Sequence, residues 1–118
     1  MDSHNRQQRR FERVSIPRGG GLIVTTPAGD WLGAVRSLGG GGLLLQGPQS
    51  FLQGQHYQLR LIDEAMNTRV DVDAVALYSI SAGIGFKFAG LEPVAAGNIA
   101  NLIEKHRERW GGSGGKEA

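Results

Sequence analysis

The sequence predicts an all-β domain with a C-terminal helix, in which the strands form a small six-stranded antiparallel β-barrel. Three observations support this fold class. Short segments of β-branched or alternating apolar residues recur along the chain, turn residues separate them, and one helical apolar pattern follows near the end. At 118 residues the chain is long enough for one domain with its own core. We expect that domain to span residues 9–110, between a flexible N-terminus (1–8) and a flexible tail (111–118).

The first half of the chain contains a short strand followed by a hairpin. Residues 14–16 alternate apolar and polar side chains and end at a segment of proline and glycine, 17–21. The β-branched residues of 22–26 predict a second strand, and 31–36 predicts its antiparallel partner. Between these two, 27–30 carries proline and glycine at positions suited to a tight reversal.

The second half of the chain contains four further short strands, and we expect about six strands to form the barrel. The four are predicted at 43–46, 57–62, 68–80 and 84–88. The segment 68–80 is long for a strand, and its alternation breaks at Val75 and Leu77. Such a break indicates a bulge, or a strand that curls from one side of a barrel to the other.

One amphipathic helix is predicted after the last strand. Its apolar face consists of Ile99, Leu102, Ile103, His106 and Trp110, which recur at helical spacing. Pro93 can occupy the first turn of a helix, but Gly97 weakens the early turns, so we expect the firm part at 99–109. The apolar face should cover an open end or a side of the barrel.

Four consecutive glycines, Gly39–Gly42, lie between two predicted strands and stand out in a domain of this size. Glycine loses more backbone entropy on folding than other residues, so such a run indicates positive φ angles or a close approach of other atoms to the backbone. It could form a sharp bend between strands. It could also form a concave backbone surface that accepts an anion or a flat ligand.

Charge and composition exclude several classes of protein. The net charge of +2 is too small to indicate a nucleic-acid-binding protein, and the lack of cysteine excludes disulfides, thiolate metal sites and a thiol nucleophile. No apolar segment is long enough to span a membrane, and no apolar segment follows the basic N-terminus as in a secretory signal. We therefore expect a soluble, cytoplasmic protein that does not insert into membranes.

The chain lacks the residue patterns of an enzyme or a metal protein. None of His4, His56 and His106 has a metal-ligand partner at short spacing, and His106 fits a packed position on the helix. The pair Asp71 and Asp73 could hold a cation, but a solvated strand face is the simpler interpretation. No nucleophile elbow or phosphate-binding loop occurs. We predict no catalytic residues, no metal and no cofactor.

The strongest functional signal is a cluster of arginines ahead of the first strand. Arg9 and Arg13 are four residues apart, with Arg10 between them. Arginine matches phosphate oxygens and the O6/N7 edge of guanine with two parallel hydrogen bonds, and it stacks on aromatic rings. Several arginines beside a glycine bend could therefore clamp a compact anionic nucleotide. A solvated basic terminus is the alternative.

These two features, in this order, resemble the PilZ domain, the bacterial receptor module for cyclic di-GMP. The family has Arg-x-x-x-Arg before its first strand, and Arg9–Arg13 matches this spacing. Its second motif, Asp/Asn-x-Ser-x-x-Gly, aligns with Ser37, Gly39 and Gly42, followed by a run of leucines. The resemblance covers about residues 9–106 and includes the closing strand 83–88 and the terminal helix.

The resemblance implies a ligand site and a signalling role. The ligand-binding residues would be Arg9, Arg10, Arg13, Ser37, Gly39, Gly41 and Gly42. Where the family has Asp/Asn and Ser, this chain has Ser37 and Gly39, and each lost hydrogen bond to a charged group costs on the order of 1.5–3 kcal/mol. We therefore expect weakened binding of cyclic di-GMP, or binding retained through backbone amides of the glycine run. Binding would change the conformation of the N-terminal arm and signal to a partner protein.

Two alternatives remain open from the sequence. The chain could be a degenerate PilZ-like module that docks a partner protein without binding nucleotide. The arginine arm could also bind nucleic acid generally, without sequence specificity, which predicts a strong dependence on salt.

Overall fold

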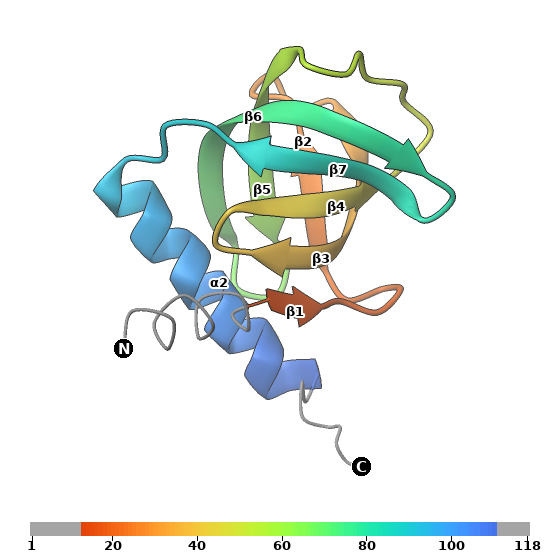
Figure 1. Cartoon of the computed structure of the whole chain (residues 1–118). Coiled ribbons are helices and arrows are strands. Elements are labelled where there is room, and N and C mark those ends of the chain that lie inside the picture. Colours follow the sequence, from red (N-terminus) through yellow and green to blue (C-terminus); the bar gives the residue numbers. More distant parts are fainter. Residues whose placement is uncertain (1–12, 111–118) are drawn as a thin grey trace, which may run out of the picture.

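The computed structural model describes residues 13–110, which form seven strands and one helix (Figure 1). The strands are β1 (Arg13–Ser15), β2 (Leu22–Thr25), β3 (Trp31–Gly39), β4 (Gly42–Gln46), β5 (His56–Asp63), β6 (Thr68–Ile80) and β7 (Gly83–Phe88), and the helix is α2 (Pro93–Trp110). The flexible ends predicted at 1–8 and 111–118 lie outside the described residues, as do His4, Arg9 and Arg10.

The strands form a closed antiparallel barrel, as predicted. Six of them follow one another in the order β3-β2-β5-β6-β7-β4, and pairing between β3 and β4 closes the ring. The seventh strand, β1, pairs with the second half of β3, at the edge that β2 leaves open (Figure 1). The expected number of about six strands thus describes the barrel, and β1 is added to its outside edge.

The strand boundaries at the glycine run differ from the prediction. We expected the strand to end at Arg36, but β3 continues to Gly39 and β4 begins at Gly42. Only Gly40 and Gly41 form the turn, because pairing between β3 and β4 continues up to the pair Gly39 and Gly42. The ladder pairing, rather than the glycines, decides where these strands end.

Register shifts interrupt three of the strand ladders, one between Val24 and Thr25 of β2 and the others in β6 and β3. The predicted irregularity in the long strand is confirmed by a register shift between Ala76 and Tyr78 of β6. A second shift, between Val35 and Ser37 of β3, was not predicted. It leaves both Arg36 and Ser37 partly exposed on the outer face of β3, where strict alternation would bury one of them.

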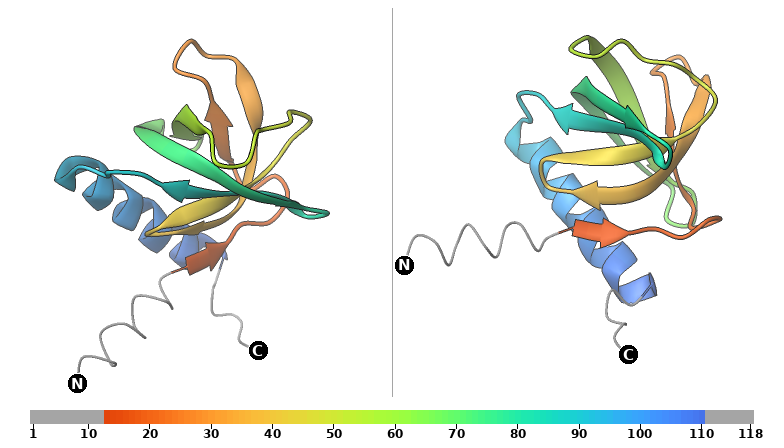
Figure 2. Two further views of the ribbon diagram at one scale, coloured as in Figure 1. Left: turned by 45° about the horizontal axis from the view of Figure 1, so that its top comes forward. Right: turned by 45° about the vertical axis from the view of Figure 1, so that its right-hand side comes forward.

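Helix α2 packs along the side of the barrel next to β1, β3 and β6 (Figure 2). Its buried residues are Ile99, Leu102, Ile103 and His106, as the helical pattern predicts. The helix begins at Pro93, six residues before the start of its predicted firm part. Gly97 therefore does not prevent helix formation in the early turns, and Pro93 occupies the first turn, where its missing N–H costs nothing.

Candidate ligand-binding site

Strand β1 brings the predicted arginine beside the second predicted motif. Arg13 pairs with Gly39, and Ser15 pairs with Ser37, in the antiparallel ladder between β1 and β3. The side chain of Arg13 extends along β3, and its Nη1 donates a hydrogen bond to Oγ of Ser37 at 3.3 Å. Residues 24 positions apart in the chain thus lie in direct contact on the outer face of the barrel.

Gly39 provides the surface on which Arg13 lies. A Cβ atom at position 39 would lie 3.2 Å from Nη1 and 3.4 Å from Cζ of Arg13. The space that a serine side chain would enter at this position is therefore bordered by the guanidinium. The glycine at position 39, where the family motif has serine, thus leaves room for the guanidinium of Arg13.

The other three glycines differ in how much space surrounds them. A Cβ atom on Gly42 would overlap the carbonyl oxygen of Phe86, since β4 and β7 approach closely there. Atoms added to Gly40 or Gly41 would meet open space. None of Gly39–Gly42 has a φ angle in the left-handed region, so close approach, and not positive φ, explains Gly39 and Gly42.

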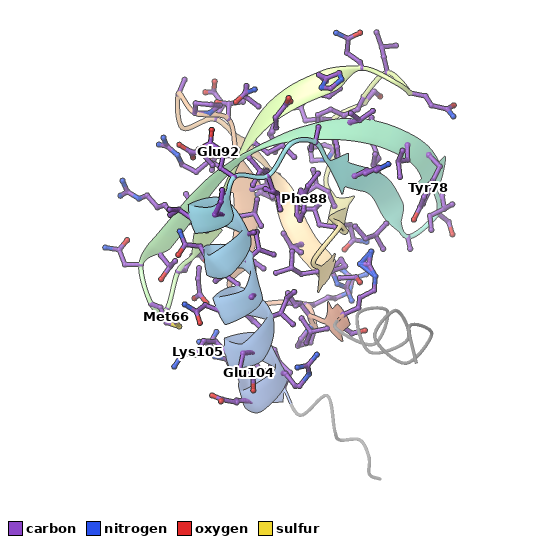
Figure 3. The ribbon with its side chains drawn as sticks, turned by 60° about the vertical axis from the view of Figure 1, so that its left-hand side comes forward. Met66, Tyr78, Phe88, Glu92, Glu104 and Lys105 are labelled. Carbon is purple, nitrogen blue, oxygen red and sulfur yellow. The ribbon has the colours of Figure 1, made fainter. Side chains whose placement is uncertain are left out.

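A shallow pocket of about 470 Å³ lies over this surface. It is lined by Arg13, Gly39, Gly40, Gly41, Gly42, Leu43, Leu77, Tyr78, Phe86 and Lys87. Lys87 adds a second cation, and Tyr78 adds an aromatic ring that is half exposed. The ring of Tyr78 lies against the backbone at Gly85, where any Cβ atom would collide with it. Figure 3 shows Tyr78 near the end of β6, at the hairpin with β7.

The charges of this face are not neutralised by the described part of the chain. No carboxylate between residues 13 and 110 forms an ion pair with Arg13, whose side chain donates within this part of the chain to the neutral hydroxyl of Ser37. On β5 and β6, by contrast, Arg60 donates two hydrogen bonds to Asp71, and the nearer one is 2.7 Å long. That hydrogen bond holds the pKa of Asp71 below its usual value. Arg13 therefore keeps its charge available for an anionic ligand.

Most of the predicted site residues come together, and the others fall outside the described part of the chain. Arg13, Gly39, Gly41 and Gly42 line one pocket, and Ser37 contacts Arg13 and lines the neighbouring pocket. Arg9 and Arg10 are not among the described residues. Sequence reasoning missed Tyr78 and Lys87, since their positions follow from the pairing of β6, β7 and β4.

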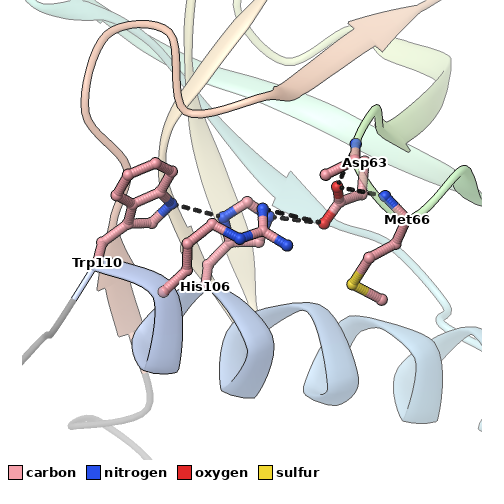
Figure 4. Close-up of polar contacts among 6 residues, drawn as sticks. Asp63, Met66, His106 and Trp110 are labelled. Atoms are coloured by element: carbon pink, nitrogen blue, oxygen red, sulfur yellow. Dashed lines mark hydrogen bonds and ion pairs between the residues drawn. The ribbon is translucent and has the colours of Figure 1, made fainter.

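A second polar cluster, buried under α2, was also missed. Nε2 of His106 donates to Oδ2 of Asp63 at 2.9 Å, and the indole Nε1 of Trp110 donates to Nδ1 of His106 at 3.0 Å (Figure 4). Oδ1 of Asp63 accepts the backbone N–H groups of Ala65 and Met66. From the sequence we expected residues 63–67 to form a polar connection, but Asp63 is the last residue of β5 and is fully buried. The i, i+4 spacing of His106 and Trp110 on the apolar face was the only signal of this network.

The protonation state of His106 follows from its partners. An indole N–H can only donate, so Nδ1 must carry a lone pair and His106 must be neutral. Burial lowers the pKa of His106, and the hydrogen bond to Asp63 only partly opposes this effect. The cluster therefore fixes α2 on the barrel without a charged histidine.

The other described polar residues considered as metal or catalytic sites lie on the surface of the barrel. Nδ1 of His56 lies 3.3 Å from Asp73 on an exposed strand face, as expected for a solvated surface. Among residues 13–110, no group of three or more potential metal ligands gathers in one place. In the same part of the chain, no helix is both long and apolar enough to cross a membrane.

Comparison with known proteins agrees with this geometry. The family model of the PilZ domain matches residues 7–105, which include both predicted motifs and α2 up to its last five residues. The chain belongs to the PilZ domain family. PilZ domains are binding modules and not enzymes, in keeping with the residue patterns of this chain.

Solved structures support the same fold. The chain is similar to an uncharacterised Legionella protein of known crystal structure, with a TM-score of 0.62 and 9% sequence identity. The match covers 83% of this chain and 96% of the Legionella protein. No curated protein sequence matches this PilZ domain.

Proposed function

We propose that this PilZ domain is a cytoplasmic receptor module that binds cyclic di-GMP on the outer face of β3 and β4. The nucleotide would rest over Gly39–Gly42, with its phosphates and guanine edges bound by Arg13 together with Arg9 and Arg10. Ligand binding would change the conformation of the N-terminal arm and thereby alter the surface offered to a partner protein.

One observation carries this proposal. Arg13 and Ser37, which belong to the two separate family motifs, are in contact at the edge of a pocket that contains no carboxylate. This contact supports a site to which both motifs contribute and whose residues already meet without ligand. Preorganisation of this kind lowers the entropic cost of binding.

The chemistry of the pocket suits a cyclic dinucleotide. Arg13 and Lys87 supply positive charge for the phosphodiesters, and the arginine fork also matches a guanine edge. Tyr78 offers a flat aromatic surface for stacking. The open backbone of Gly40 and Gly41 allows a large ligand to approach without steric hindrance.

A degenerate interaction module is the second candidate function. The end of β6 presents three exposed apolar side chains, Leu77, Tyr78 and Ile80, which could contact a partner protein directly. Ser37 and Gly39 are the positions at which this chain departs from the family motif. The two functions therefore differ in whether nucleotide is needed.

Calorimetry with cyclic di-GMP tests the proposed function. We expect saturable binding by the full chain, weakened about tenfold or more in Arg13→Gln through the loss of charge-assisted hydrogen bonds. Arg69→Gln, which removes an exposed arginine on β6, is the matched control and should bind as the native chain does. Absence of heat at high micromolar ligand, with the protein folded, would refute receptor function.

The variants Ser37→Asp and Ser37→Asp/Gly39→Ser separate the two candidates. If the native chain is a weak receptor, Ser37→Asp should strengthen binding, because a carboxylate accepts stronger hydrogen bonds than a hydroxyl. Gly39→Ser alone should not, since its side chain displaces Arg13. Binding that arises only in the double variant would favour the degenerate module.

A further inference from the structure

A second pocket, of about 750 Å³, lies on the other side of Ser37. It is lined by Ser15, Ile16, Pro17, Arg18, Arg36, Ser37, Leu44, Gln46, Ser81, Ala82 and Trp110. Ser37 connects the two pockets. It lines the second pocket and accepts a hydrogen bond from Arg13, which lines the first pocket. The second pocket contains two arginines, three hydroxyls and an indole ring, but no carboxylate and no part of the glycine run.

Arg36 is held in this pocket by neutral partners. The bulge in β3 directs its side chain outward, and the carbonyl oxygen of Arg36 accepts the N–H of Ile16 at 2.9 Å. Its Nε donates to the carbonyl oxygen of Ile16 at 3.0 Å, and its Nη1 donates to Oε1 of Gln46 at 2.9 Å. Within residues 13–110, Nη2 has no hydrogen bond and the guanidinium has no ion pair. A partly buried, rigidly held cation therefore faces the pocket uncompensated.

The other groups of the pocket reinforce this charge. Arg18, from the loop after β1, forms no hydrogen bond or ion pair with any described residue and can turn toward a ligand. The C-terminal end of α2 would by itself repel an anion, but Arg107 and Arg109 in the last turn offset its dipole. Two guanidinium groups without carboxylates favour a doubly charged anion over a singly charged one.

Trp110 adds an aromatic component. Its indole N–H is already engaged with Nδ1 of His106, so the ring is held in place while 38% of the residue remains exposed. A positioned ring at the side of a cationic pocket is suited to stack with the planar base of a nucleotide. The volume of the pocket lies within the range of small-molecule sites.

We infer that this second pocket binds a nucleotide through a terminal phosphate. The phosphate monoester would bind to Nη2 of Arg36 and to Arg18, and the base would stack on Trp110. A terminal phosphate carries a charge of about −1.5 to −2 at neutral pH, whereas each phosphodiester of a cyclic dinucleotide carries one negative charge. The two pockets thus differ in the ligand that they select, and this inference does not depend on binding of cyclic di-GMP in the first.

Fluorescence of Trp110 tests the inference directly. The chain has two tryptophans, and Trp31→Phe removes the other, which is half exposed. In this background, guanosine 5′-monophosphate should change the emission of Trp110 saturably at submillimolar concentration. Guanosine, which lacks the phosphate, should cause no saturable change, and inorganic phosphate should compete with the nucleotide.

Charge variants decide whether the signal comes from this pocket. Arg18→Gln and Arg36→Gln should each weaken nucleotide binding about tenfold, while Arg69→Gln, the control on the exposed face of β6, should leave it unchanged. Arg18→Gln is the variant least expected to disturb folding, because Arg18 forms no hydrogen bond or ion pair with residues 13–110. No saturable change in emission, equal binding of guanosine, or unaltered affinity in Arg18→Gln would overturn the inference. Binding of cyclic di-GMP is tested by a different variant, Arg13→Gln, and by a different ligand, so either proposal can fail while the other holds.

Discussion

Two contacts join distant parts of the chain, and they differ in how completely their polar groups are hydrogen-bonded. At the helix, Asp63 and His106 meet in full burial, and both ring nitrogens of His106 and both oxygens of Asp63 have partners. On the outer face of β3, Arg13 meets Ser37 with one long hydrogen bond at an exposed position. The first contact has no capacity left for a ligand, whereas the second keeps a full positive charge and several free donors.

This difference distinguishes a structural polar contact from a functional one. Burial requires every polar group to be paired, because an unpaired one costs free energy in a low-dielectric interior. Exposure removes that requirement, so cations without an ion pair, such as Arg13 and Arg18, can persist on the surface. Their position beside two pockets supports the proposal that this surface binds anionic ligands.

The largest effect is expected where the buried contact is broken. His106→Ala leaves the carboxylate of Asp63 buried beside only two backbone N–H groups and Arg109 at 3.7 Å. Removal of the hydrogen-bond partner of a buried group costs about 1–3 kcal/mol, and more for a charged group, so we expect a decrease at or above the upper end of that range in the free energy of unfolding. Urea denaturation followed by circular dichroism measures it.

Arg13→Gln breaks the exposed contact with Ser37, as His106→Ala breaks the buried contact with Asp63. Its effect on the free energy of unfolding should stay within about 0.5 kcal/mol, as for other surface substitutions. If Arg13→Gln destabilises the domain as much as His106→Ala does, the exposed contact is structural, and the distinction between the two contacts is wrong.

Glycine substitutions sharpen the comparison within the candidate site. Gly42→Ala should destabilise the domain by about 1–3 kcal/mol, since the new methyl group overlaps the carbonyl oxygen of Phe86 and must push β4 from β7. Gly40→Ala adds a methyl group in open space, without positive φ, and should be neutral or slightly stabilising. Thermal unfolding of both variants checks this. Equal destabilisation would mean that the turn itself, and not strand approach, requires glycine.

The sequence predicted the barrel and α2 because both depend on repeating apolar patterns. Alternation located each strand within a few residues, and it also located the bulge at Ala76 and Tyr78. The extent of β3 was mispredicted, since glycines inside a ladder look like a turn when the partner strand is unknown. The bulge at Arg36 was missed for the same reason, because only the pairing with β4 reveals it.

The sequence predicted where the candidate site lies but not all of the residues that line it. The two motifs placed Arg13 beside Ser37 and Gly39, which the pairing of β1 with β3 brings together. Tyr78 and Lys87 enter the pocket from strands that are distant in sequence, so no local pattern could indicate them. Asp63 was missed because a polar residue at the end of a strand is usually solvated, and only α2 buries it.

The smallest expected effect is a pH dependence that belongs to the buried contact alone. The pKa of His106 is lowered in the folded state, mainly by burial, so the unfolded chain binds a proton more readily. The stabilisation is therefore complete above the ordinary histidine pKa of 6.5 and decreases as the pH falls through that value. Unfolding free energies measured by urea from about pH 8 to about pH 5.5, above the range of most carboxylates, should fall accordingly.

Trp110→Phe tests the physical cause of this pH dependence. The substitution removes the N–H that occupies Nδ1 of His106, so that nitrogen becomes free to accept a proton next to the buried carboxylate of Asp63. The pKa of His106 should then rise, and the loss of stability on acidification should be smaller than in the native chain. An acid-induced loss that is unchanged in Trp110→Phe would show that the hydrogen bond from the indole does not keep His106 neutral. The helix contact would then depend on burial alone, without the complete pairing that separates it from the contact between Arg13 and Ser37.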